Sequence, residues 1–261
     1  MFDFFKQWRH GRALARAKER VQIDEALWFD TLTRFHFLEA LAPGERARLR
    51  ELVQLFLDQK EFATAHELPM TQNMRLSVAC QACMLILNLG IEYYRGWSGI
   101  VLYPAQFRPR HTYMDPMGIM HQGEEVLSGE AWPGGPVILS WEDVEQGSRD
   151  GVNVVIHEFA HKLDMLNGAA NGHPPLHPGM KQGVWANVFT QAYEDFCRWV
   201  DSGRYTPIDP YASEAPAEFF AVFSEAFFET PDIVKDIYPA LYEQMSLFYR
   251  QDPGARVVAG G

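Results

Sequence analysis

A short segment of the chain combines two histidines and a glutamate at a spacing that can bind a metal ion. The segment Val154-Val-Ile-His157-Glu158-Phe-Ala-His161 contains the pattern His-Glu-x-x-His. Four residues are about one helical turn, so both imidazoles project from one face of a helix and can share a single ion. The apolar residues before His157 give the segment the character of a buried helix. The pattern indicates metal chemistry and requires further ligands from elsewhere in the chain.

A catalytic zinc site takes three protein ligands and leaves the fourth position for water, so a third ligand is needed. The pattern with a third histidine downstream requires glycine at 164 and histidine at 167, but the chain has Asp164 and Asn167. The alternative is a carboxylate from a later helix, and that region contains Glu214, Glu218, Glu225 and Glu229. Glu218 and Glu225 are seven residues apart and lie on nearly the same helical face, so one can bind metal and the other can lie behind it.

These residues resemble the peptidase domain of the Mlc titration factor A family, whose catalytic domain is related to that of anthrax lethal factor. The resemblance rests on His157-Glu-Phe-Ala-His161 together with Tyr211-Ala-Ser-Glu-Ala-Pro-Ala-Glu218. In that family a tyrosine precedes the glutamate ligand by seven residues, and Tyr211 and Glu218 match this offset. The similarity extends from the region near residue 97 through the C-terminal helices.

The resemblance implies a role for each of these residues. His157, His161 and Glu218 would be the ligands of one zinc ion per chain. Glu158 would be the general base that takes a proton from the zinc-activated water, and Tyr211 would stabilise the transition state. The implied activity is that of a zinc metallopeptidase of the gluzincin type, with aminopeptidase-type cleavage of short peptides. The resemblance also implies binding to the Mlc glucose repressor, and through it regulation of sugar-uptake genes.

Two further acids are candidates for positions behind the ligands. Asp164 follows His161 by three residues on the ligand face. A hydrogen bond from Asp164 to an imidazole or to the C-terminal helices is one interpretation, and a surface or loop-capping role is the other. Glu225 could support a metal ligand in the same way or pair with a basic residue elsewhere.

A second hypothesis is a non-catalytic regulatory protein that sequesters a repressor and has a secondary metal site. Its motivation is the family's partner together with the basic character of residues 1–20 on an otherwise acidic chain. This segment could be a partner-binding arm. It could also be a solvated helix face with its aromatic residues packed inward, namely Phe2, Phe4, Phe5 and Trp8.

The elements that must position these residues form an α+β protein. Residues 1–89 show helical periodicity and predict a helical N-terminal lobe, while 90–261 are expected to form a zincin-like catalytic domain packed against it. Its expected strands are Gly99–Tyr103 and 136–141, separated by a mostly irregular stretch. Its expected helices span about 150–166, 183–201, 214–229 and 232–249. By resemblance, the second strand would be the edge strand that pairs with an extended substrate, but its continuous apolar run also fits an interior strand.

Length and composition narrow the class of protein further. A chain of 261 residues with 47% apolar residues can bury a large core. The excess of 34 acidic over 23 basic residues argues against direct nucleic-acid binding. No apolar stretch approaches the roughly 18 residues of a membrane helix, and the first twenty residues lack the apolar core of a secretory signal. With three cysteines, an odd number, we expect a protein of the reducing cytoplasm.

Overall fold

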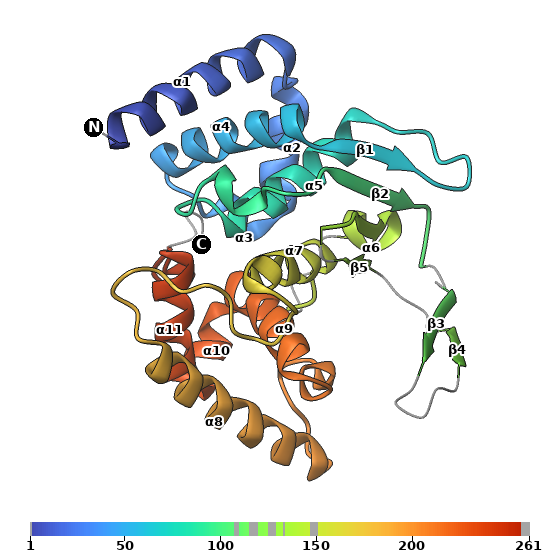
Figure 1. The fold of residues 1–261 in the computed structure, drawn as a ribbon, viewed down its shortest axis with the longest axis vertical. Coiled ribbons are helices and arrows are strands. Elements are labelled where there is room, and N and C mark those ends of the chain that lie inside the picture. Colours follow the sequence, from blue (N-terminus) through green and yellow to red (C-terminus); the bar gives the residue numbers. More distant parts are fainter. Residues whose placement is uncertain are drawn as a thin grey trace.

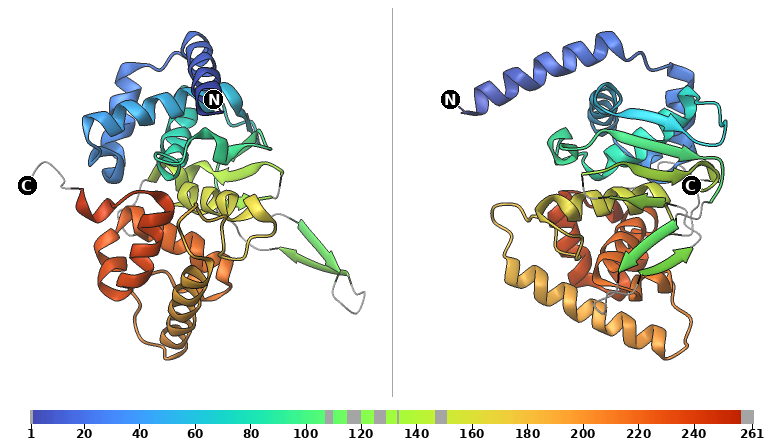
Figure 2. Two further views of the ribbon diagram at one scale, coloured as in Figure 1. Left: turned by 60° about the vertical axis from the view of Figure 1, so that its left-hand side comes forward. Right: turned by 45° about the vertical axis from the view of Figure 1, so that its right-hand side comes forward.

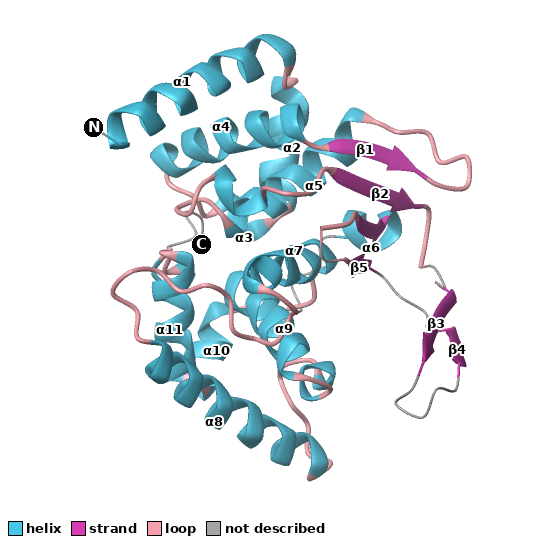
Figure 3. Cartoon of the chain, in the orientation of Figure 1, coloured by secondary structure: helices cyan, strands magenta, loops and turns pink. Residues whose placement is uncertain are grey.

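The computed structural model describes residues 2–106, 110–114, 120–124, 129–132, 134–146 and 151–256. For residues 2–9, 110–114 and 120–124 the description covers the backbone alone. Figures 1 and 3 show a mostly helical molecule with a small sheet, in which the N-terminal helices lie above the sheet and the C-terminal helices below it. The α+β class predicted from the sequence is confirmed.

In the N-terminal part, α1 contacts α4 and α4 contacts α5. Lys18 and Arg20 at the end of α1 form ion pairs with Glu51 and Asp58 of α4, at 3.0 and 3.5 Å. The aromatic side chains expected on the inner face of this segment lie outside the described residues. The helices are α1 (Phe2–Arg20), α2 (Glu25–Arg34), α3 (His36–Glu39), α4 (Pro43–Gln59) and α5 (Gln72–Leu85).

A four-stranded sheet has the order β1-β2-β6-β5. Its strands are β1 (Glu61–Thr64), β2 (Gly99–Tyr103), β6 (Val137–Ser140) and β5 (Gly129–Ala131). The first three run parallel, and β5 runs antiparallel to β6. Ile100, Leu102, Val137 and Leu139 share one buried face because side chains alternate along a strand. A separate hairpin, β3 (Arg110–Met114) with β4 (Met120–Glu124), projects from the body in the left view of Figure 2.

Two expectations about strands need correction. One strand, β1, lies within the stretch 1–89 that was expected to be helical, and it pairs with β2 across the expected boundary between the lobes. The strand expected at the substrate edge, β6, is interior, between β2 and β5. Its continuous apolar run fits this position, because β6 has buried residues on both faces of the sheet. The strand at that edge of the sheet is β5.

The C-terminal part contains the predicted helices, with two differences. Helix α6 (Trp141–Gln146) was not predicted, and it begins at Trp141, the last residue of the strand expected over 136–141. The predicted helix over 232–249 is two helices, because Pro239 lacks an amide donor and drives Tyr238 out of the helical conformation, to φ −133° and ψ 66°. The helices are α6 (Trp141–Gln146), α7 (Val154–Asp164), α8 (Gln182–Asp201), α9 (Pro216–Glu229), α10 (Pro231–Ile237) and α11 (Pro239–Tyr249). Short 3-10 turns are η1 (Ile91–Tyr94), η2 (Met165–Asn167), η3 (Pro210–Ser213) and η4 (Pro253–Ala255). None of the described helices is long and apolar enough to span a membrane.

Helix α7 occupies the centre of the molecule, in contact with α5, α9, β5 and β6. Phe159, on its inner side, is fully buried. Its ring contacts those of Phe56, Tyr94 and Trp97, with centroids 5.7, 5.1 and 5.7 Å away. This aromatic cluster joins α7 to α4 and to the segment before β2, so the core is continuous between the N-terminal and C-terminal parts.

Two buried lysines flank the indole of Trp97. The Lys60 ammonium lies 3.6 Å from the ring centroid and donates to the carbonyls of Tyr94 and Trp97. The Lys162 ammonium lies 4.7 Å from the same centroid and donates to the carbonyls of Trp132 and Gly135, at 2.6 and 2.8 Å. Burial lowers the pKa of each lysine to about 8. Lys162 thereby holds the turn between β5 and β6 against α7.

The depressed pKa of Lys60 makes a prediction about stability. Between pH 8 and about 10 the unfolded chain keeps its proton on this lysine while the folded chain releases it, so the free energy of unfolding should rise with pH. Relative to Lys60→Met, wild-type protein should gain up to about 1.4 kcal/mol per pH unit, the limit for one proton. Urea unfolding across this range measures the difference. Lys18→Met, at an exposed site, should show the same pH dependence of the free energy of unfolding as wild type. If the free energies of unfolding of Lys60→Met and wild type changed equally with pH, the prediction would be contradicted.

Candidate metal centre

The two histidines of the motif are brought together by helix α7. Asn153 caps the start of this helix, its Oδ1 accepting a hydrogen bond from the Ile156 amide at 3.0 Å. His157 and His161 project from one face, with ring centroids 4.8 Å apart and the two Nε2 atoms 3.2 Å apart. This is the arrangement that the spacing of the motif predicts.

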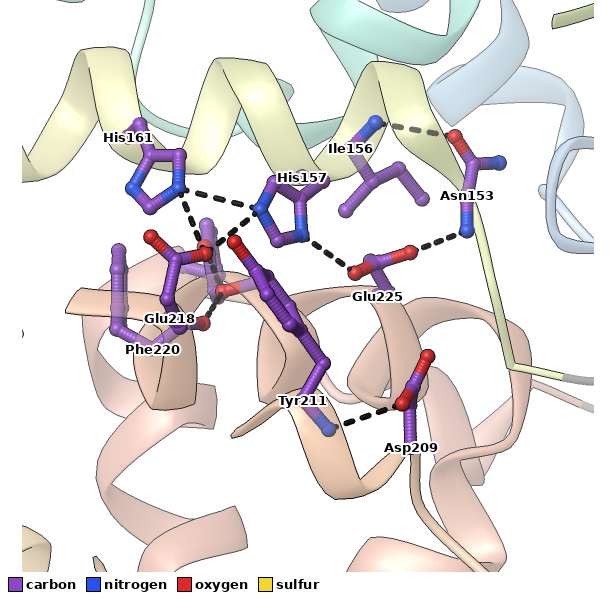
Figure 4. A network of polar contacts seen from close by, with 11 residues as sticks. Asn153, Ile156, His157, His161, Asp209, Tyr211, Glu218, Phe220 and Glu225 are labelled. Atoms are coloured by element: carbon purple, nitrogen blue, oxygen red, sulfur yellow. Dashed lines mark hydrogen bonds and ion pairs between the residues drawn. The ribbon is translucent and has the colours of Figure 1, made fainter. Parts of the chain in front are cut away.

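Helix α9 supplies a carboxylate to the same point. Pro216 begins α9 and places Glu218 in its first turn, facing α7. Glu218 Oε2 lies 3.1 Å from His157 Nε2 and 3.4 Å from His161 Nε2. Figure 4 shows Glu218 directed at both imidazoles. One ligand atom from each of the three residues lies within 4.8 Å of the others. Two imidazole nitrogens and one carboxylate oxygen form the donor set of a catalytic zinc site, so these residues fit such an ion.

The four candidate carboxylates of this region take different places. Glu218 is the one that reaches both imidazoles. Glu214 precedes α9 and is exposed. Glu225 and Glu229 are buried on the later turns of α9, behind the histidines. Residue spacing left these candidates open, and the packing of α9 on α7 distinguishes them.

The charges of the site strongly affect one another. Burial would raise the pKa of Glu218, but hydrogen bonds to His157 and His161 hold this pKa well below its usual range. Burial would lower the pKa of His157, yet the carboxylates of Glu225 and Glu218 raise it well above the ordinary value. The raised pKa favours the positively charged form of His157 between these two carboxylates. A divalent cation would take over that role, and its affinity should fall as the pH falls because protons compete for the same atoms.

Glu225 supports His157 from behind. Its Oε1 lies 2.7 Å from His157 Nδ1, and its Oε2 accepts a hydrogen bond from the backbone amide of Asn153. A carboxylate at Nδ1 fixes the tautomer of an imidazole and directs Nε2 toward the metal. Glu225 thus lies at one of the two places considered for it from the sequence, next to a predicted ligand.

Asn153 connects this support to the N-terminal helices and was not among the predicted residues. Its Nδ2 donates to Gln81 of α5 at 2.7 Å and to Glu229 of α9 at 2.8 Å. Its backbone amide also donates to Glu225. Asn153 therefore joins α5 and α9 to the start of α7. The sequence did contain a signal, because asparagine directly before an apolar helical segment is a typical N-cap.

Asp164 is buried at the end of α7 and bonds to the loop that follows. Its Oδ2 accepts hydrogen bonds from the backbone amides of Asn171 and Gly172, both at 2.7 Å. These contacts correspond to the loop-capping interpretation of Asp164. They hold the 171–172 turn, where Gly172 packs against Pro216 at the start of α9.

Glu158 and Tyr211 come from different elements next to the predicted ligands. Glu158 projects from α7 toward β5 and is 5% exposed, and burial raises its pKa to about 7. Tyr211 belongs to η3, which is capped by Asp209, and its ring centroid is 6.1 Å from that of His157. Its side chain is 47% exposed and extends toward His157 and Glu218 in Figure 4.

Comparison with known proteins gives an independent view of the chain. The family model described as "Glucose-regulated metallo-peptidase M90" matches residues 5–250. Proteins named Mlc titration factor A from Yersinia pestis (strain Pestoides F) and Yersinia pseudotuberculosis (serotype O:1b, strain IP 31758) are 35% identical over 237 residues. Each alignment covers 89% of this chain and 87% of the relative. The matched range of the family model includes every residue of the site described above.

The contact of Glu225 with His157 predicts an effect on metal affinity. Glu225→Gln keeps the size of the side chain but removes the charge that orients the imidazole, so zinc affinity should fall about 10- to 100-fold. Competition with a chromogenic chelator measures this affinity. Glu243→Gln, on the exposed face of α11, provides a control with the same chemical change. Equal zinc affinities of Glu225→Gln and wild type would show that Glu225 does not support the site.

Proposed function

The chain belongs to the glucose-regulated metallo-peptidase M90 family and is a relative of Mlc titration factor A, and we propose that it is a zinc-dependent peptidase of the gluzincin type. The observation that carries the proposal is the convergence of His157, His161 and Glu218 from two helices, with Glu158 directly beside the first ligand. A structural zinc site would have four protein ligands and no need for an adjacent buried carboxylate.

The three residues would hold one zinc ion per chain and leave a position open to solvent. Bound there, zinc would polarise a water molecule and lower its pKa toward 7. Hydrogen bonding of His157 to Glu225 would keep Nε2 directed at the ion. The largely buried setting of the ligands strengthens these electrostatic interactions.

Glu158 would act as the general base. It would accept a proton from water as the water oxygen attacks the peptide carbonyl, and return that proton to the leaving amine. Burial brings its pKa to about 7, which suits both accepting and donating a proton near neutral pH. Tyr211, at the rim of the site, would donate a hydrogen bond from its hydroxyl to the oxyanion, an interaction that strengthens as charge develops.

The edge strand β5 is the natural place for an extended substrate. Among the described residues β5 pairs with β6 on one side, and its other edge has no neighbouring strand. A peptide that added to this edge would be held by main-chain hydrogen bonds, which orient a substrate without demanding a particular sequence. Aminopeptidase-type cleavage is the specificity we propose from the family resemblance. Comparing free and N-acetylated forms of the same peptides distinguishes it from endopeptidase activity.

Replacing the general base should separate chemistry from metal binding. Zinc-loaded Glu158→Gln should lose at least about 100-fold in kcat on aminoacyl chromogenic substrates, because proton transfer contributes about that much or more. Its zinc content should equal that of wild type, since Glu158 is not a ligand. Glu142→Gln, on the exposed part of α6, serves as the control. Equal activity of Glu158→Gln and wild type would refute the peptidase assignment.

The name of the relatives supports a second function, and we propose that the protein also binds a transcriptional repressor of the Mlc type and thereby regulates sugar-uptake genes. Such a partner would place the protein in the cytoplasm. The basic helix α1 is the surface we propose for this contact, because it contrasts with the net charge of −11 of the whole chain. The two functions would then use separate surfaces.

Repressor binding should therefore survive Glu158→Gln and be lost when residues 1–20 are removed. Calorimetry with purified Mlc-type repressor measures both affinities, and circular dichroism shows whether the shortened chain keeps its fold. A protein that binds repressor only when zinc is present, and that cuts no peptide, would instead be a regulatory protein with a secondary metal site. Unchanged binding after removal of residues 1–20 would place the contact elsewhere.

A further inference from the structure

Gly129, the first residue of the edge strand, lies directly against Glu158. A Cβ atom placed on Gly129 would be 2.5 Å from Glu158 Oε1, 2.6 Å from Glu158 Cγ and 2.8 Å from Val154 Cγ2. Real Cβ atoms essentially never lie within 3.0 Å of such neighbouring atoms. Any side chain at position 129 would therefore displace its neighbours on α7.

The backbone conformation does not explain a glycine at this position. Gly129 is paired with Leu139 in a regular antiparallel ladder, and its φ lies outside the left-handed range. Every residue type adopts such an extended conformation. In contrast, Gly134 and Gly151 have φ values of 64° and 89°, which do favour glycine. At position 129 it is the space occupied by the neighbouring side chains that requires glycine.

The strand has little freedom to move away from α7. Its partner β6 holds it by ladder hydrogen bonds, and Lys162 holds the turn that follows it, through the carbonyls of Trp132 and Gly135. Lys162 lies one helical turn beyond Glu158 on α7. The helix that carries Glu158 therefore also fixes the strand against which Glu158 packs.

Of the two side chains in contact with Gly129, Glu158 is the one that would move. Val154 is β-branched and buried, with one strongly preferred rotamer in a helix. Glu158 has three rotatable side-chain bonds, and within the described part of the chain its carboxylate makes no hydrogen bond that would hold it in place. The position of this carboxylate therefore depends on packing, and Gly129 is one of the residues against which it packs.

We propose that Gly129 is a positioning residue for Glu158: the gap that it leaves in the edge strand determines where the carboxylate lies. The inference rests on the proposed peptidase function, in which Glu158 is the general base. Because a substrate peptide would pair with the same strand, the gap also fixes the base relative to the bond that is cut. Glycine at 129 thereby links the strand that orients the substrate to the residue that transfers the proton.

Zinc-loaded Gly129→Ala tests this role. A shift of about 1 Å in a reacting group costs up to about 100-fold in rate, so kcat should fall about 10- to 100-fold while KM stays within about threefold of wild type. Zinc stoichiometry should be unchanged, and a crystal structure of the variant should show the Glu158 carboxylate displaced. Gly183→Ala in α8, where a Cβ atom meets nothing within 4 Å, should leave both parameters as they are.

A double variant asks whether the effect passes through Glu158. In the Glu158→Gln background, Gly129→Ala should reduce kcat no further, because residues that act as one unit are not additive. An equal loss in both backgrounds, or an unmoved Glu158 carboxylate in the crystal structure, would overturn the proposal.

If Gly129→Ala does not fold, Gly129→Ala with Val154→Ala removes the valine contact and leaves the contact with Glu158. Should wild type cut no peptide, the proposed function fails, while the crystal structure still decides whether Gly129 positions Glu158.

Discussion

Three carboxylates lie largely buried around two imidazoles, and the arrangement of α7 and α9 has to offset the cost of removing these charges from water. Glu218 is shared by both imidazoles, and Glu225 is held between His157 and the amide of Asn153. Among the described residues Glu158 has no such partner, and burial raises its pKa to about 7. A divalent cation at this point would neutralise the remaining negative charge. Binding of the ion would therefore also stabilise the fold.

Helix α7 can hold these groups because it is fixed along its whole length. Asn153 caps its start and joins it to α5 and α9. Phe159 anchors its middle in the aromatic cluster. At its end, Lys162 bonds to the turn after β5, and Asp164 bonds to the loop that leads toward α8. Side chains on so constrained a helix keep the geometry that the proposed metal binding and proton transfer would require.

The N-terminal helices contribute more than a separate lobe. Strand β1 belongs to them in sequence but to the sheet in space, and Gln81 of α5 accepts a hydrogen bond from the residue that caps α7. Lys60, at the end of α4, shares the indole of Trp97 with Lys162. The position of β5 next to α7 therefore depends in part on residues from the first third of the chain.

The sequence by itself determined the groups whose geometry is local. The spacing of His157 and His161 fixes their relation on any helix, and the class of fold followed from periodicity and from the short strands. Residue spacing left four carboxylates as candidates, and the family resemblance selected Glu218. Only the tertiary structure decided that β5 rather than β6 lies at the edge of the sheet, that Asp164 bonds to a loop, and that Gly129 packs against Glu158. Those relations join segments far apart in the chain, and they depend on how helices and strands pack together, which local spacing does not encode.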